Sequence, residues 1–172
     1  IMILFQNDYN QACHPQILKK ITDFAFTAMP GYGEDPICAH AADLIRKACE
    51  NNDLSVHFLV GGTQTNAVVI ASMLQSYEGV MAADTGHVGC HEAGAIEYTG
   101  HKVLTLPNHQ GKVDGLELKA YLQAFYADEN HEHMVFPGML YISHPTEYGT
   151  LYTKKELAEL ANICREYEIP LY

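Results

Sequence analysis

The stretch VHFLVGGTQTNAVVIASML, residues 56–74, joins two apolar runs through a glycine pair and a short polar segment. This order predicts a strand, a tight turn and the N-terminus of a helix. The first N–H groups of a helix have no partner within it, and the helix dipole favours negative charge there. Gly61 and Gly62 permit close backbone approach. Thr63 adds a hydroxyl donor, and Thr65 is a candidate to cap the helix.

The turn therefore has the features of a phosphate site. It contains neither GxxxxGK[ST] nor GxGxxG, so it is not a P-loop or a dinucleotide fingerprint. An ordinary tight connection between a strand and a helix has the same local pattern, so phosphate binding requires partners elsewhere in the chain.

Around this stretch, short apolar runs alternate with helical patterns. The expected strands are VHFLV (56–60), GVMAA (79–83), KVLTL (102–106), MLYIS (139–143) and IPLY (169–172). Helices are expected near 65–77, 89–97, 115–127 and 154–168. The alternation predicts an α/β fold with a mainly parallel sheet and helices on both faces.

Before residue 56 the pattern is helical, so residues 1–55 are assigned to an N-terminal segment with helices. Pro15 is suited to the first position of a helix that ends near Ala28. Asp35 is expected to cap a second helix. Near the other end of the chain, Thr153 and Glu156 have the spacing of a capping box.

Composition excludes several classes of function. The net charge of −11 over 172 residues argues against a nucleic-acid partner and against docking on an anionic membrane surface. No apolar run approaches the roughly 20 residues of a membrane span, and no signal peptide is indicated. The five cysteines form no CxxC pair, which favours free thiols in a reducing compartment such as the cytoplasm.

The segment ADTGHVGCHEAGAIEYTGHK, residues 83–102, follows the second expected strand. His87 comes just after that strand, where ligands bind in parallel sheets. A histidine at this position is able to stack on a ring or to transfer a proton. A metal site of His87, His91 and Glu92 is the alternative, but HxxxH alone is a weak signal and no metal site is assigned.

Four segments, taken in order, resemble the threonine aldolase and β-eliminating lyase family, whose members have the aspartate-aminotransferase fold. They are NDYN (7–10), GYGEDP (31–36), GGTQTN (61–66) and HVGCHEAGA (87–95). The resemblance implies a pyridoxal 5′-phosphate enzyme. It makes residues 56–172 the first part of the large, cofactor-binding domain, and it implies a homodimer or homotetramer.

The resemblance also implies roles for individual residues. Gly62 and Thr63 bind the cofactor phosphate, and Gly61 shapes the turn. His87 stacks on the pyridine ring and is the first candidate for a catalytic base. The substrate or the subunit interface lies near three further residues, which are Asn7, Asp8 and Tyr32.

Two departures from the family pattern are expected to matter. HPTEY, residues 144–148, places Glu147 where the aldolases have a histidine near the substrate, so Glu147 is the second candidate base. The Asp-Gly-Ala-Arg segment expected after IPLY is absent, and none of the lysines lies in a motif matching the Schiff-base Lys. The lysines are Lys19, Lys20, Lys47, Lys102, Lys112, Lys119, Lys154 and Lys155. The chain is therefore expected to be truncated and inactive alone.

For the intact protein, these features predict cleavage of the Cα–Cβ bond of a β-hydroxy amino acid, such as threonine to glycine and acetaldehyde. A β-eliminating lyase with the same cofactor is an alternative. Two further alternatives belong to other functional classes: a non-catalytic fragment and a metal hydrolase.

Overall fold

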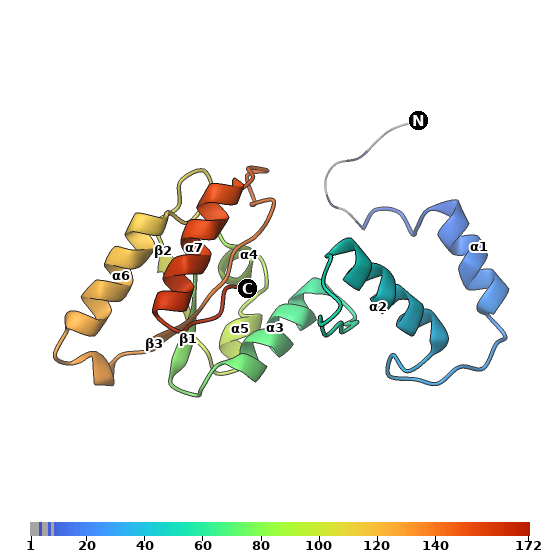
Figure 1. The fold of residues 1–172 in the computed structure, drawn as a ribbon, viewed down its shortest axis with the longest axis horizontal. Helices are drawn as coiled ribbons and strands as arrows, with labels where there is room; N and C mark the ends of the chain where they lie inside the picture. Colours follow the sequence, from blue (N-terminus) through green and yellow to red (C-terminus); the bar gives the residue numbers. More distant parts are fainter. Residues whose placement is uncertain (1–3, 5–6, 8) are drawn as a thin grey trace. The chain divides into compact units, whose positions relative to one another are not determined.

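The computed structural model describes residue 4, residue 7 and residues 9–172. The chain divides into two compact units, residues 1–58 and residues 59–172, and each is described by itself. The second unit contains the parallel sheet and the helices that cover it (Figure 1).

The first unit contains two helices with proline in their first turns. Helix α1 covers Pro15–Phe24 and ends before the predicted Ala28. Residues 25 and 26 form a turn after the helix, so Ala28 lies outside it. Helix α2 covers Pro36–Ala48, and the carboxylate of Asp35 accepts hydrogen bonds from two first-turn N–H groups, both at 2.9 Å. The predicted cap is confirmed.

The sheet of the second unit has three strands in the order β2-β1-β3, and both pairings are parallel. Strand β1, Glu78–Ala83, lies between β2, Val103–Leu106, and β3, Phe136–Leu140. Leu171 adds a parallel bridge to Leu140, so IPLY begins to pair on the outer side of β3. The predicted parallel sheet is confirmed.

The helices of this unit match the predicted segments to different degrees. They are α3 (Gly62–Met73), α4 (His87–Cys90), α5 (Ala95–Tyr98), α6 (Gly115–Ala127), the 3₁₀ helix η1 (His131–His133) and α7 (Lys154–Glu166). Helix α6 has the predicted bounds. Helix α7 begins with the predicted capping box, in which Thr153 and Glu156 bond to each other's backbone N–H groups.

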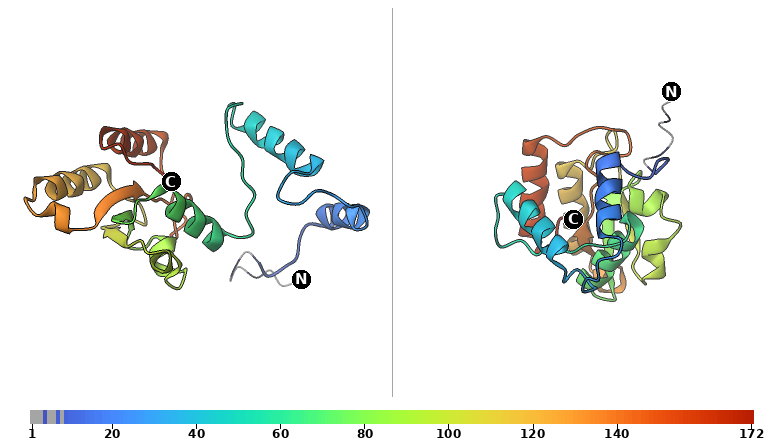
Figure 2. Two further views of the ribbon diagram at one scale, coloured as in Figure 1. Left: turned by 90° about the horizontal axis from the view of Figure 1, so that it is seen from below. Right: turned by 90° about the vertical axis from the view of Figure 1, so that its right-hand side faces the viewer.

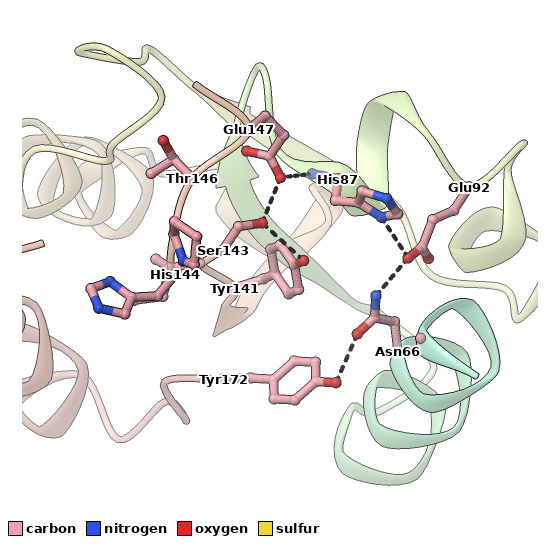
Figure 3. Close-up of a pocket in the computed structure, with 12 residues that line it drawn as sticks. Asn66, His87, Glu92, Tyr141, Ser143, His144, Thr146, Glu147 and Tyr172 are labelled. Carbon is pink, nitrogen blue, oxygen red and sulfur yellow. Dashed lines mark hydrogen bonds and ion pairs between the residues drawn. The ribbon is translucent and has the colours of Figure 1, made fainter. Parts of the chain in front are cut away.

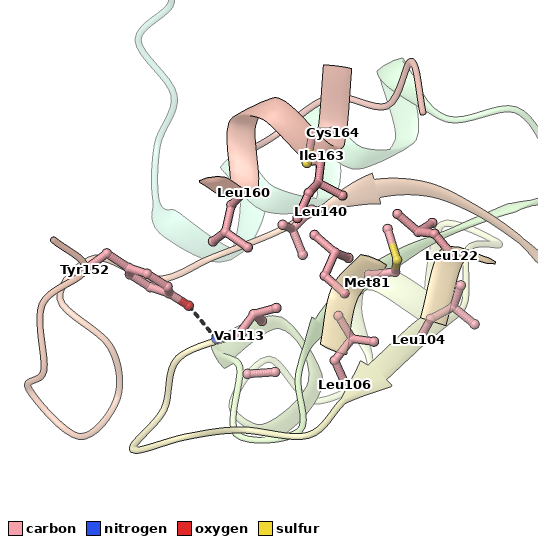
Figure 4. Close-up of a cluster of buried hydrophobic side chains, with 12 residues drawn as sticks. Met81, Leu104, Leu106, Val113, Leu122, Leu140, Tyr152, Leu160, Ile163 and Cys164 are labelled. Atoms are coloured by element: carbon pink, nitrogen blue, oxygen red, sulfur yellow. Dashed lines mark hydrogen bonds between the residues drawn. The ribbon is translucent and has the colours of Figure 1, made fainter. Parts of the chain in front are cut away.

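Alternate side chains of β1 enter two separate apolar cores. Val80 and Ala82 pack with residues of α3, α4 and α5, whereas Met81 and Ala83 pack with residues of α6 and α7. Figures 1 and 2 show α6 and α7 side by side on one side of the sheet, and Figure 4 shows the core beneath them. Because successive residues of a strand point to opposite faces, burial of both sets requires helices on both faces of the sheet.

Two of the predicted elements do not form. Residues 56–60 form no strand, and Val60 is 94% exposed. A strand needs a neighbour for its backbone groups, and this run has none among the residues described. Residues 89–97 do not form one helix, because Ala93 and Gly94 adopt positive φ angles of 52° and 76° between α4 and α5. Such angles interrupt a right-handed helix.

No helix in the described part of the chain is long and apolar enough to cross a membrane. All five cysteine thiols are free, and only Cys164 among them is buried. Burial raises the pKa of the Cys164 thiol to about 11, so this side chain behaves as an apolar group of the core.

We predict that Leu122→Ala in the full-length protein lowers the free energy of unfolding by about 2–5 kcal/mol, because it leaves a cavity in the core. Leu122 is fully buried on α6. The matched control is Leu116→Ala on the same helix, where the side chain is 75% exposed. Chemical denaturation should show a change of less than about 0.5 kcal/mol for the control. Equal losses for the two variants would contradict the packing described.

Candidate active site

A pocket of about 530 Å³ lies at the edge of the sheet where β1 and β3 end (Figure 3). Residues from four segments, far apart in the sequence, line it. They are Gly62, Asn66, His87, Glu92, Tyr141, Ile142, Ser143, His144, Pro145, Thr146, Glu147 and Tyr172. In an open parallel sheet, ligands bind beyond the carboxyl ends of the strands, so the pocket has the position expected of a functional site.

The order of the elements explains why these side chains meet. Helix α3 is joined to β1 by a short connection and shares a core with it, so the N-terminus of α3 reaches the carboxyl edge of the sheet. His87 lies four residues after the end of β1 and is the first residue of α4. Ser143 and Glu147 follow β3, which pairs with β1 in parallel. Because parallel neighbours end at the same edge, the segments after β1 and β3 converge.

His87 is held at its backbone by the segment after β3. Its N–H donates to Glu147 Oε1 at 2.9 Å, and the Ser143 hydroxyl donates to the same oxygen at 2.6 Å. The hydroxyl groups of Ser143 and Tyr141 are 3.1 Å apart. The Glu147 carboxylate therefore connects the ends of β1 and β3 across the pocket, as Figure 3 shows.

The ring of His87 is held by a different carboxylate. His87 Nδ1 lies 2.9 Å from Glu92 Oε1, and Asn66 Nδ2 donates to the same oxygen at 2.6 Å. The Tyr172 hydroxyl in turn donates to Asn66 Oδ1 at 2.7 Å. The side chain of Glu92 is fully buried, whereas that of His87 is 46% exposed. The imidazole is thus held at Nδ1 by a buried carboxylate, and the rest of the ring is accessible from the pocket.

Two tyrosines in this pocket keep their phenolic protons. Burial, opposed by the hydrogen bond with Ser143, raises the pKa of Tyr141 above its usual value. Burial and the nearby charge of Glu92 raise the pKa of Tyr172 in the same way. Both phenols therefore remain hydrogen-bond donors at neutral pH.

The N-terminus of α3 can receive an anionic group. Gly61 is the N-cap residue, and no side chain caps the helix in the part of the chain that the structure describes. Gly62 lines the pocket, Thr63 is exposed in the first turn, and no atom lies within 4 Å of the position that a Cβ at Gly62 would take. Thr65 is not the predicted cap, because its hydroxyl donates to Gly61 O at 2.9 Å.

The structure brings together only some of the residues predicted for the site. Gly62, His87 and Glu147 line one pocket. Asn7 and Tyr32 belong to the first unit, so their proximity to the pocket stays a prediction. Asp8 lies outside the described residues.

Among the residues of the pocket, sequence reasoning assigned a role in the proposed site only to Gly62, His87 and Glu147. Tyr141 and Ser143 belong to the predicted strand MLYIS, and their position at its carboxyl end is a signal that could have indicated them. Asn66 and Tyr172 gave no such signal, because they meet across 106 positions of sequence. Glu92 was noted in the metal alternative and within the segment HVGCHEAGA (87–95), without a role in the proposed site. In the described part of the chain, no group of three histidine, cysteine or acidic side chains is arranged to hold a metal ion.

The fold and pocket define an α/β domain with a ligand site at the carboxyl edge of a parallel sheet. The sequence model of the family described as "Beta-eliminating lyase" matches residues 18–172. The chain belongs to this family. Two low specificity L-threonine aldolases, from Pseudomonas sp. and Pseudomonas aeruginosa, are 33% and 31% identical to it over 143 residues. These matches cover 82% of the chain and 40% of each relative.

Solved structures also match this chain. A structure of Leishmania major threonine aldolase is 43% identical, with a TM-score of 0.89, and the match covers 96% of this chain and 47% of that one. An alanine–glyoxylate aminotransferase from Nostoc sp. matches with a TM-score of 0.63 at 20% identity, covering 92% of this chain and 39% of the other. At that identity the match shows the aminotransferase fold alone. The chain thus spans less than half the length of these relatives.

Proposed function

We propose that the full-length protein is a pyridoxal-phosphate-dependent lyase that cleaves threonine, or a similar β-hydroxy amino acid, to glycine and an aldehyde. One observation carries the proposal: a histidine and an uncapped helix N-terminus share one pocket. The chain that forms this pocket is 33% and 43% identical to two threonine aldolases. That resemblance favours aldol cleavage over β-elimination.

The residues present fit the proposed cofactor. The N–H groups of Gly62 and Thr63 belong to the first turn of α3, where a phosphate is stabilised by free donors and the helix dipole. The exposed Thr63 hydroxyl is a further donor to the phosphate. The partly exposed ring of His87 is the group that would lie against the pyridine ring. When bound, pyridoxal phosphate supplies an electron sink for the charge left on Cα.

In this proposal, His87 removes the β-hydroxyl proton of the substrate. Loss of that proton allows the Cα–Cβ bond to break, so that the oxygen leaves within the aldehyde and Cα, once protonated, becomes that of glycine. A general base of this kind contributes roughly 10²–10⁴-fold to the rate. Glu147 holds the backbone N–H of His87, and Glu92 holds its ring nitrogen Nδ1.

Glu147 is proposed to act on the same substrate side chain. Its carboxylate lines the pocket and contacts the backbone of His87. An acidic group at this position accepts a hydrogen bond from a substrate hydroxyl, and we propose that it affects which β-hydroxy amino acids are preferred.

The activity is proposed for the full-length protein. No lysine lines the pocket in the part of the chain that the structure describes, and the chain spans less than half the length of its relatives. The family resemblance further implies a homodimer or homotetramer, and the cysteine pattern favours the cytoplasm; both stay predictions.

The proposed function is tested with the full-length protein, pyridoxal phosphate and threonine, by measuring glycine and acetaldehyde. We expect turnover above the rate of the free cofactor. His87→Ala should lower kcat roughly 10²–10⁴-fold, because it removes the base. His91→Ala is the control: its ring centroid lies 5.6 Å from that of His87, but it does not line the pocket.

His91→Ala should change kcat by less than about threefold, which corresponds to well under 1 kcal/mol. Equal losses in the two variants, restored by zinc, would favour the metal alternative and contradict the proposal. Circular dichroism of each variant excludes loss of folding as the cause.

Glu147→Gln should lower kcat/KM for β-hydroxy amino acids roughly tenfold or more, because a hydrogen bond to a charged group is worth about 1.5–3 kcal/mol. The amide oxygen can still accept the bonds from His87 and Ser143, so the change isolates the charge. Glu132→Gln, at an exposed position in η1, is the control. Parent-like rates across a panel of substrates would place Glu147 outside the reaction.

A further inference from the structure

Glu92 is a buried carboxylate whose two oxygens have different surroundings. Its side chain is fully buried. Oε1 is 2.9 Å from His87 Nδ1 and 2.6 Å from Asn66 Nδ2. Oε2 is buried and has no hydrogen-bond partner among the described residues. A buried carboxylate with one unpaired oxygen is unfavourable for stability, and a catalytic role is one of the explanations for such a group in a native structure.

Tyr172, Asn66, Glu92 and His87 form a series of hydrogen bonds, and their directions follow from Tyr172. The raised pKa of Tyr172 keeps its hydroxyl protonated, and that hydroxyl donates to Asn66 Oδ1 at 2.7 Å. The amide of Asn66 is therefore oriented with its NH₂ group toward Glu92, where it donates to Oε1. Glu92 accepts this bond as a carboxylate.

The same oxygen faces His87 Nδ1, and two acceptors cannot bond to each other. Nδ1 must therefore carry a proton. In the neutral imidazole only one nitrogen is protonated, so Nε2 retains its lone pair. The hydrogen bond that one ring nitrogen makes thus determines which nitrogen can act as a base.

We propose that Glu92 is a positioning residue, which fixes the tautomer and the ring orientation of His87 so that Nε2 is the atom that accepts a proton. Asn66 and Tyr172 orient the Glu92 carboxylate, and Glu92, whose side chain is fully buried, acts through His87. The tautomer follows from the contacts of this chain alone. Its catalytic consequence rests on the proposed function.

The tautomer is measured without cofactor by ¹⁵N NMR of histidine-labelled full-length protein, with the His87 signals identified by their loss in His87→Asn. The parent protein should show a protonated Nδ1 and an unprotonated Nε2. Glu92→Ala should raise the population with the proton on Nε2. An unchanged tautomer in Glu92→Ala would overturn the proposal.

Glu92→Gln is the conservative variant. Its amide oxygen can occupy the position of Oε1 and accept both bonds, so the parent tautomer should be retained. Loss of that tautomer in Glu92→Gln would contradict the inferred directions of the hydrogen bonds. If Glu92→Ala does not fold, Glu92→Leu replaces it, because leucine is closer in size and offers no acceptor.

A double-mutant cycle with threonine tests whether Glu92 acts through His87. Glu92→Ala should lower kcat roughly 10- to 100-fold, a part of the contribution of a general base, with a smaller effect on KM. In the His87→Ala background the same change should cost less than about threefold, since coupled residues are not additive. Equal costs in both backgrounds would make Glu92 structural only and overturn the positioning role.

The two proposals fail in different ways. A parent protein that binds pyridoxal phosphate but cleaves no β-hydroxy amino acid would refute the proposed function, whereas the NMR result would still decide the role of Glu92. An active parent with an Nε2-protonated His87 would refute the role of Glu92 and leave the proposed function standing.

Discussion

The parallel pairing of β1 with both of its neighbours is the constraint on which the pocket depends. The register of β1 against β3 brings the segments that follow both strands to one edge, where His87 and Glu147 meet. Both faces of β1 are buried, so a shift of one residue would exchange the side chains that enter the two cores. The apolar cores therefore fix the register, and the register places the polar groups.

The polar groups of the pocket form a connected set. Tyr172, Asn66, Glu92 and His87 are joined by successive hydrogen bonds, and Glu147 holds the backbone of His87 from the other side. Each of these side chains must keep its orientation, because a buried polar group that loses its hydrogen-bond partner lowers the stability of the fold. The arrangement leaves the free edge of the imidazole toward the cavity. It also explains why residues from four separate segments are needed to present one histidine.

The parallel sheet and several local features of this fold could be read from sequence, whereas the side-chain contacts between distant segments of the pocket could not. The capping residues Asp35 and Thr153, and the carboxyl-end position of His87, depend on near neighbours, and the structure agrees with them. The helix expected at 89–97 failed because Ala93 adopts a positive φ angle, which is rare for alanine. The contact between Asn66 and Tyr172 depends on the whole sheet, and no spacing in the sequence indicates it.

The most direct test of the proposed site is a crystal structure of the full-length protein with pyridoxal phosphate. We expect the phosphate to lie within hydrogen-bond distance of the backbone N–H groups of Gly62 and Thr63 and of the Thr63 hydroxyl. The pyridine ring should lie against the imidazole of His87, with Glu92 Oε1 still bonded to Nδ1. A phosphate bound away from the N-terminus of α3, or a pyridine ring that does not contact His87, would refute the proposed site.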